Sequence, residues 1–168
     1  MRSLPDPGFA GDDGSTPDGV AAALAAYDRD PDGLHLATLA VLQEARVLVP
    51  VVAVLGEVEH DAQGLAHDKT SDMAAVLLRG RDGRTALLGF TGSDALRAWD
   101  PQARPVPVSL AAAARAARQD EAAAMVLDVA GPVRFVVESD DLQRLAEGLR
   151  LREVGERGHR SWAWVQEL

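Results

Sequence analysis

Two apolar runs that meet at a turn signal constrain the fold more than any other feature of the sequence. The stretch AAVLLRGRDGRTALLGF, residues 74–90, places Asp82 and Gly83 between the runs. An Asp-Gly pair tolerates the positive φ angles of a tight two-residue turn, and both flanks are apolar. The stretch therefore predicts a β-hairpin that turns at Asp82 and Gly83.

Helical and extended patterns surround this hairpin. Helices are predicted in residues 18–27 and 34–45, and again after Ser93 or Asp94, Ser109 and Ser139, which are typical helix caps. Apolar, β-branched runs predict strands in residues 46–55, 124–130 and 133–138, with a weaker edge strand in residues 160–168. Pro50 cannot donate to a β-ladder, so a bulge or one-sided pairing is expected there. The order of elements predicts an α/β (α+β) protein with a mixed β-sheet, a central hairpin and flanking helices.

The length and the local composition indicate one domain with an N-terminal tail. A chain of 168 residues lies within the usual range of a single domain. Residues 1–19 are rich in Pro, Gly, Asp and Ser and nearly devoid of apolar side chains, so they are predicted to form a flexible acidic tail that packs against nothing. The domain is then expected to span residues 20–168.

The composition excludes several functions and compartments. The chain has no cysteine, which excludes disulfides and thiolate chemistry and suits the cytoplasm. Its net charge of −9, with dispersed arginines, argues against nucleic-acid binding. The start of the sequence lacks the charged and apolar segments of a signal peptide, and no apolar stretch approaches the ~20 residues of a membrane helix. The P-loop, the nucleophile elbow and the dinucleotide-binding fingerprint are all absent from the sequence, so no cofactor is expected.

Four segments together resemble the SseB-like family, which is defined by the SseB N-terminal domain, and its actinobacterial members in particular. They read RVLVPVVAVLGEVE, DKTSDMA, FTGSDALRAWDPQARPVPV and MVLDVAGPVRFVVE, and the resemblance covers residues 34–147. It departs from the family pattern at Gly92 and at Val129. The resemblance implies an α/β fold and a cytosolic role, and it brings no catalytic residues with it.

The most polar stretch inside this region is HDKTSDM, residues 67–73. Lys69, Ser71 and Asp72 could contact a ligand or partner, since polar loops beside rigid strands are common binding sites. In a catalytic alternative, Ser71 attacks, Asp72 orients or deprotonates it, and Lys69 stabilises an anion. The alternative without a site is that these residues form a solvated loop that leads into the next strand.

A second polar stretch, GEVEHD, places Glu57 and Glu59 on one face of an extended chain. Carboxylates suit a divalent cation, but the spacing matches no known metal-binding loop, so the sequence predicts contact residues here and no metal site.

Two hypotheses of function remain open. The first is a cytosolic interaction or regulatory module that binds a protein partner or a small metabolite, either as a monomer or as a homo-oligomer. The second is a small hydrolase- or transferase-like enzyme that uses the loop of Lys69, Ser71 and Asp72. The enzyme requires this loop and the acidic loop to converge in one pocket, and we favour the first hypothesis.

Overall fold

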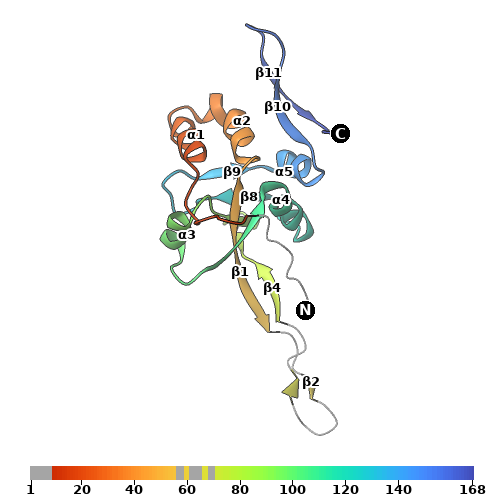
Figure 1. Cartoon of the computed structure of the whole chain (residues 1–168). Helices are drawn as coiled ribbons and strands as arrows, with labels where there is room; N and C mark the ends of the chain where they lie inside the picture. Colours follow the sequence, from red (N-terminus) through yellow and green to blue (C-terminus); the bar gives the residue numbers. More distant parts are fainter. Residues whose placement is uncertain (1–8, 56–58, 61–65, 68–70) are drawn as a thin grey trace.

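The computed structural model describes residues 9–55, 59–60, 66–67 and 71–168. These residues form a single α+β domain (Figure 1). The helices are α1 (Asp18–Arg29), α2 (Pro31–Leu42), α3 (Ser93–Trp99), α4 (Leu110–Gln119) and α5 (Ser139–Ala146). The strands are β1 (Arg46–Leu55), β2 (Glu59–His60), β3 (Ala66–His67), β4 (Ser71–Ala75), β5 (Leu77–Arg79), β6 (Thr85–Gly89), β7 (Arg104–Ser109), β8 (Ala124–Leu127), β9 (Phe135–Val137), β10 (Arg150–Val154) and β11 (Ser161–Val165).

The strands of the body form two sheets. One has the order β4-β1-β7 and is antiparallel throughout, and the other has the order β5-β6-β8-β9. In the second sheet β6 and β8 run parallel, while β5 and β9 are antiparallel to their neighbours. The mixed sheet expected from the sequence is therefore confirmed.

The two sheets are joined where the chain passes from β4 to β5. The N–H of Val76 donates to the carbonyl of Pro50 at 3.3 Å, and the carbonyl of Val76 accepts from Leu88 at 3.2 Å. Because proline has no N–H, Pro50 cannot return the bond, and the carbonyl of Val76 is used by β6 instead. Pro50 also lies opposite Pro105 of β7. The one-sided pairing expected at Pro50 is thus confirmed, and it lies at the junction between the sheets.

The predicted hairpin is present as β5 and β6, with Leu77 opposite Leu87. Its turn is one residue longer than expected. The N–H of Gly80 donates to the carbonyl of Arg84 at 2.8 Å, which leaves residues 81–83 as the loop. Gly83 has a φ of 82°, whereas Asp82 keeps a negative φ. A three-residue loop with glycine in the left-handed region needs only one such residue, and Gly83 supplies it.

The core lies on both faces of the sheets. Alternate residues of β1 and β6 point to opposite faces, as the two-residue period of a strand requires. Val47 and Leu87 belong to the larger cluster, to which α1, α2, α4 and α5 contribute, while Leu48 and Leu88 pack with α3. Trp99 of α3 packs in the smaller cluster, with its ring 5.5 Å from that of Phe90. The expected assignment of helices to flanking layers is confirmed.

The predicted caps are only partly correct. The Ser109 hydroxyl accepts from the N–H of Ala112 and caps α4 as expected. Helix α3 instead begins after Gly92, and α5 begins after Glu138, with no side-chain cap bond at either position. At α3 the backbone N–H of Ser93 is used by a tertiary contact to the carbonyl of Gly14, described below.

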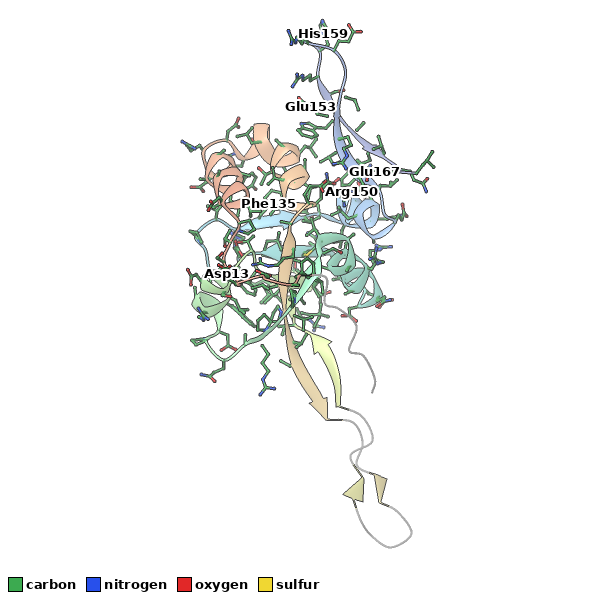
Figure 2. The ribbon with its side chains drawn as sticks, in the orientation of Figure 1. Asp13, Phe135, Arg150, Glu153, His159 and Glu167 are labelled. Carbon is green, nitrogen blue, oxygen red and sulfur yellow. The ribbon has the colours of Figure 1, made fainter. Side chains whose placement is uncertain are left out.

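The expected C-terminal strand is β11, which pairs with β10 in a hairpin that projects from the body (Figure 1). Figure 2 shows Arg150 near its base and His159 at its outer end. The side chain of Gln43 links the base of this hairpin to the end of α2. Its amide N–H donates to the carbonyl of Leu151 at 2.7 Å, and its oxygen accepts from the N–H of Leu151 at 2.8 Å. Trp164 packs under the guanidinium of Arg144 at 5.9 Å.

In the ranges that the structure describes, no helix has the length and apolar character needed to cross a bilayer.

Candidate functional site

Two polar side chains follow the one parallel pair of strands in the described sheets. Thr91 comes two residues after β6 and Asp128 comes directly after β8. Both are buried, with exposed fractions of 2% and 1%. The carboxyl ends of parallel strands meet at one edge of a sheet, and ligands of α/β proteins bind in the crevice outside that edge. The topology therefore places Thr91 and Asp128 where a binding site is expected.

Asp128 binds Thr91 through both carboxylate oxygens. The backbone N–H of Thr91 donates to Oδ1 at 2.8 Å, and the hydroxyl of Thr91 donates to Oδ2 at 2.6 Å. Burial raises the pKa of Asp128, and the two bonds from Thr91 partly oppose that rise because they favour the charged form. Asp128 also has a φ of 53°, a conformation that Asp and Asn tolerate better than most residues. Asp128 thus combines a buried, hydrogen-bonded side chain with a backbone conformation that few residue types adopt.

The hydroxyl of Thr16 extends this pair toward the surface. Its Oγ1 lies 3.3 Å from Oγ1 of Thr91, so Thr16, Thr91 and Asp128 form a chain of polar groups. Thr16 is half-buried, and it belongs to the segment that precedes α1. The chain therefore connects a buried carboxyl to a side chain that solvent can reach.

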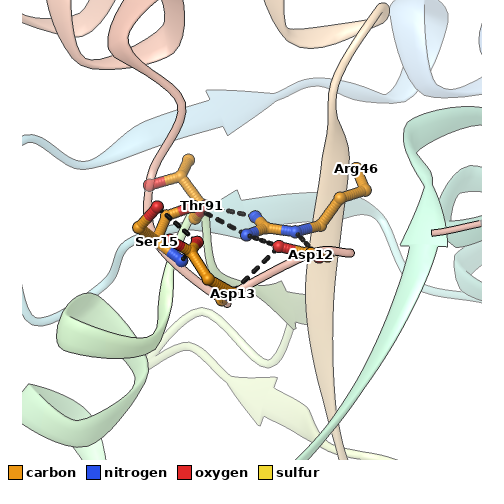
Figure 3. A network of polar contacts seen from close by, with 6 residues as sticks. Asp12, Asp13, Ser15, Arg46 and Thr91 are labelled. Atoms are coloured by element: carbon orange, nitrogen blue, oxygen red, sulfur yellow. Dashed lines mark hydrogen bonds and ion pairs between the residues drawn. The ribbon is translucent and has the colours of Figure 1, made fainter. Parts of the chain in front are cut away.

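Residues 12–16, which we call the strap, are bound to the body by Arg46 at the start of β1 (Figure 3). The Arg46 guanidinium donates to both carboxylate oxygens of Asp12, at 2.6 and 3.0 Å. It also donates to the carbonyls of Thr91 and Ser15, at 2.5 and 2.7 Å. The Arg46 side chain is only 5% exposed. A planar guanidinium is the one side chain that can make such a fork and reach two further carbonyls.

The strap corrects the prediction of an N-terminal tail. Residues 1–19 were expected to pack against nothing, which is wrong for residues 12–16, because they bind Arg46, Thr91 and Ser93. The bonds from Arg46 and from the N–H of Gly14 hold the pKa of Asp12 below its usual range. The polar composition of the strap fits this mode of attachment, because the segment is bound through hydrogen bonds and an ion pair. Residues 1–8 lie outside the described part of the chain.

A pocket of about 680 Å³ adjoins the chain of Thr16, Thr91 and Asp128. Its apolar walls come from α1, from α3 and from the loop after β8. Its exposed edge carries charged side chains. The lining includes Leu24, Ala25 and Val133, the three polar groups just named, and the edge residues Asp28, Arg29 and Asp94.

Gly92 is expected to control how closely the strap lies against the body. A Cβ added at Gly92 would lie 2.6 Å from the backbone nitrogen of Thr16 and 3.1 Å from its Cα, so Gly92→Ala must displace the strap. The φ of Gly92 is −162°, which any residue adopts, so the effect is steric. We expect faster amide exchange in residues 12–16, measured by hydrogen–deuterium exchange with mass spectrometry.

Gly19→Ala is the matched control, because nothing lies within 4 Å of a Cβ added at Gly19 in α1. Unchanged exchange in the strap of Gly92→Ala would contradict the close approach.

The contact residues predicted from the sequence do not contribute to this site as far as they are described. Ser71 and Asp72 lie in β4, opposite Leu55 and Val54 of β1. Glu59 lies in β2, opposite His67, in the part of the molecule farthest from the helices (Figure 1). Glu57 and Lys69 lie outside the described residues. The convergence of the two polar loops, and the enzyme hypothesis that requires it, therefore stay predictions.

The sequence reasoning missed Arg46, Thr91 and Asp128, although all three lie in segments that carry the family resemblance. Arg46 opens RVLVPVVAVLGEVE. Thr91 is in FTGSD and Asp128 is in LDVAGP. A signal was present for Thr91 and Asp128, because each follows an apolar strand within two residues and is close to a glycine. What could not be seen was the pairing of β6 with β8, which are separated by α3, β7 and α4.

Metal binding has no support among the described side chains, since no three histidine, aspartate or glutamate residues among them are grouped as an ion would require.

Comparison with known proteins gives one assignment. A search of curated proteins and a search of solved structures each returned no match. A family model described as the SseB protein N-terminal domain matches residues 20–144, which include most of the pocket and both of its buried polar residues. The match covers well over half of the chain and agrees with the resemblance of the four segments. The chain therefore belongs to the SseB N-terminal domain family.

Proposed function

We propose that this protein is a regulatory or interaction module that binds a small molecule in the pocket beside Thr91 and Asp128. The observation that carries the proposal is the position of a buried, hydrogen-bonded carboxyl at the carboxyl ends of β6 and β8, on the surface of a pocket of about 680 Å³. Small-molecule sites are typically concave, mostly apolar and of about 300–1,000 Å³, with a few well-placed polar groups. The lack of cysteine supports a cytoplasmic setting.

A second pocket lacks the buried polar groups that favour the pocket beside Asp128 as the binding site. It has a volume of about 380 Å³ and lies between α4 and the sheet of β1 and β7. Its lining consists mainly of alanine and valine side chains, with Gln119 and Asp120 as its polar members. Neither of these is buried. Specificity requires polar groups fixed in position, and the pocket beside Asp128 has them.

The proposal is tested by filling the pocket from α1. Ala25 is exposed on α1 and lines the pocket, so Ala25→Leu should occupy part of it without disturbing the core. A fragment library screened by saturation-transfer NMR should give hits against the parent protein that are lost in Ala25→Leu. Ala22 is the matched control, since it is also exposed on α1 and is not part of the pocket lining.

Ala22→Leu should keep the fragment hits of the parent protein. Hits that survive in Ala25→Leu would show that the fragments bind elsewhere, and the proposal would then be wrong.

A further inference from the structure

We propose that the pocket selects an organic cation, an amine that carries its proton at neutral pH on a small apolar body. This inference rests on the proposed function and names the class of ligand. It follows from the hydrogen atoms of the polar chain, from the charges at the edge of the pocket, and from the apolar walls.

The hydroxyl hydrogens of Thr16 and Thr91 are already used in hydrogen bonds that run toward Asp128. With Asp128 ionised, the hydroxyl of Thr91 donates its single hydrogen to Oδ2 at 2.6 Å. Oγ1 of Thr91 can then only accept, so the hydrogen of Thr16 points to it across 3.3 Å. The remaining capacity of both hydroxyls and of the carboxylate consists of lone pairs. A ligand that meets this surface must therefore bring hydrogen-bond donors.

The charges around the pocket favour the same class. Asp28 and Asp94 lie at the exposed edge of the pocket and Asp128 lies at its buried end. Arg29 is the one cationic side chain among the described lining residues, so the three carboxyl groups outnumber it. The nearby cation Arg46 is not free to bind a ligand anion, because its guanidinium is occupied by Asp12 and by the carbonyls of Ser15 and Thr91. An anionic ligand would therefore face an excess of negative charge, and a cationic ligand would be attracted.

A cation would also relieve the burial of Asp128. Burial raises the pKa of Asp128, because a carboxylate shielded from water loses solvation. A bound ammonium group supplies the opposite charge that stabilises the ionised carboxyl, and charge-assisted hydrogen bonds are about twice as strong as neutral ones. The apolar body of the ligand would lie against Leu24 and Val133 of the walls.

The test compares three probes of nearly equal shape on the full chain: cyclohexylmethylamine, cyclohexylmethanol and cyclohexanecarboxylate. Affinities are measured by titration of the ¹⁵N-labelled protein at neutral pH. The amine should bind about tenfold more tightly than the alcohol, which is the usual gain from one charge-assisted hydrogen bond. The carboxylate should bind more weakly than both.

Variants assign the preference to the polar chain. Asp128→Asn should reduce the affinity for the amine to that for the alcohol, because it removes the buried negative charge. Thr16→Val, at a half-buried position, should weaken the amine by about threefold through the loss of one acceptor, and it carries the test if Asp128→Asn does not fold. Ala25→Leu should abolish binding of all probes, whereas Ala22→Leu should not.

Two results would overturn the inference, and they are distinct. If the alcohol or the carboxylate binds as tightly as the amine, and Ala25→Leu still blocks binding, then the ligand class is wrong and the proposed function stands. If no probe or library fragment binds, or if binding is indifferent to Ala25→Leu, both proposals fail.

Discussion

Replacing Arg46 with methionine is expected to lower the free energy of unfolding by about 3 kcal/mol, because a buried guanidinium and its hydrogen bonds to three residues are lost together. Methionine keeps much of the side-chain volume but removes the donors to Asp12, Ser15 and Thr91. Thr91 would then have a buried carbonyl with one bond fewer, and the strap would lose its main attachment. Urea denaturation followed by circular dichroism measures the change.

Arg152→Met is the matched control for this effect. Arg152 is an arginine that forms ion pairs as Arg46 does, with the carboxylates of Glu44 and Glu167, but its side chain is 40% exposed. Exposed ion pairs contribute little to stability because water and salt screen them, so Arg152→Met should destabilise the protein much less than Arg46→Met. Equal losses in the two variants would contradict the role given to the buried fork.

At low pH, the difference in the free energy of unfolding between the parent protein and Arg46→Met should become smaller. Because the folded state lowers the pKa of Asp12, the unfolded chain takes up the proton first as the pH falls. The stabilisation by this pair is complete above the usual aspartate pKa of about 3.9. It is lost as the pH falls through the lower pKa of the folded state. The two proteins should therefore differ less in stability near pH 2 than at pH 7.

Asp128→Ala is the second substitution with a large expected effect, a loss of about 3 kcal/mol. Two costs add up: the N–H and hydroxyl of Thr91 lose their buried acceptor, and alanine must adopt a φ near 53°. Asp128→Asn should cost about 1 kcal/mol or less, since asparagine tolerates this φ and still offers one carbonyl oxygen to Thr91. Thermal and urea unfolding of both variants check the difference.

The pH dependence of Asp128 has the opposite sign to that of Asp12. Because burial raises the pKa of Asp128, the folded protein keeps this proton to a higher pH than the unfolded chain does. Stability is therefore lost as the pH rises from about 3.9 to the raised pKa of the folded state, and the loss stays constant above it. Asp128→Asn lacks this loss, so its stability relative to the parent should improve as the pH rises through that window. An unchanged difference would contradict the burial of a titrating carboxyl.

Local sequence signals predicted the elements of the fold well. The hairpin of β5 and β6 was visible because its turn residues and apolar flanks are adjacent in the chain. The helices α1 and α2 were visible for the same reason, but α2 begins at Pro31 and ends at Leu42, three residues before the expected bounds of 34 and 45. The length of the turn was wrong by one residue, because either loop places Gly83 at a position with positive φ.

The site was missed because its parts meet only through tertiary contacts. Thr91 and Asp128 lie 37 residues apart in the sequence, and Arg46 lies 34 residues from Asp12. The composition of the strap suggested disorder, since it has almost no apolar side chain that could repay ordering. Nothing local indicates that a buried arginine needs the carboxylate and carbonyl of that segment as acceptors.

The position of the strap also sets an order of events during synthesis on the ribosome. Thr16 is made early, but its partner Thr91 follows 75 residues later and Asp128 later still. At about 5–20 residues per second, the first of these intervals lasts roughly 4 to 15 s. Arg46 is made during this interval, but Thr91 and Ser93, the other partners of the strap, are still absent. The nascent chain therefore exposes this segment to proteases and modifying enzymes until β6 and its following loop have been made.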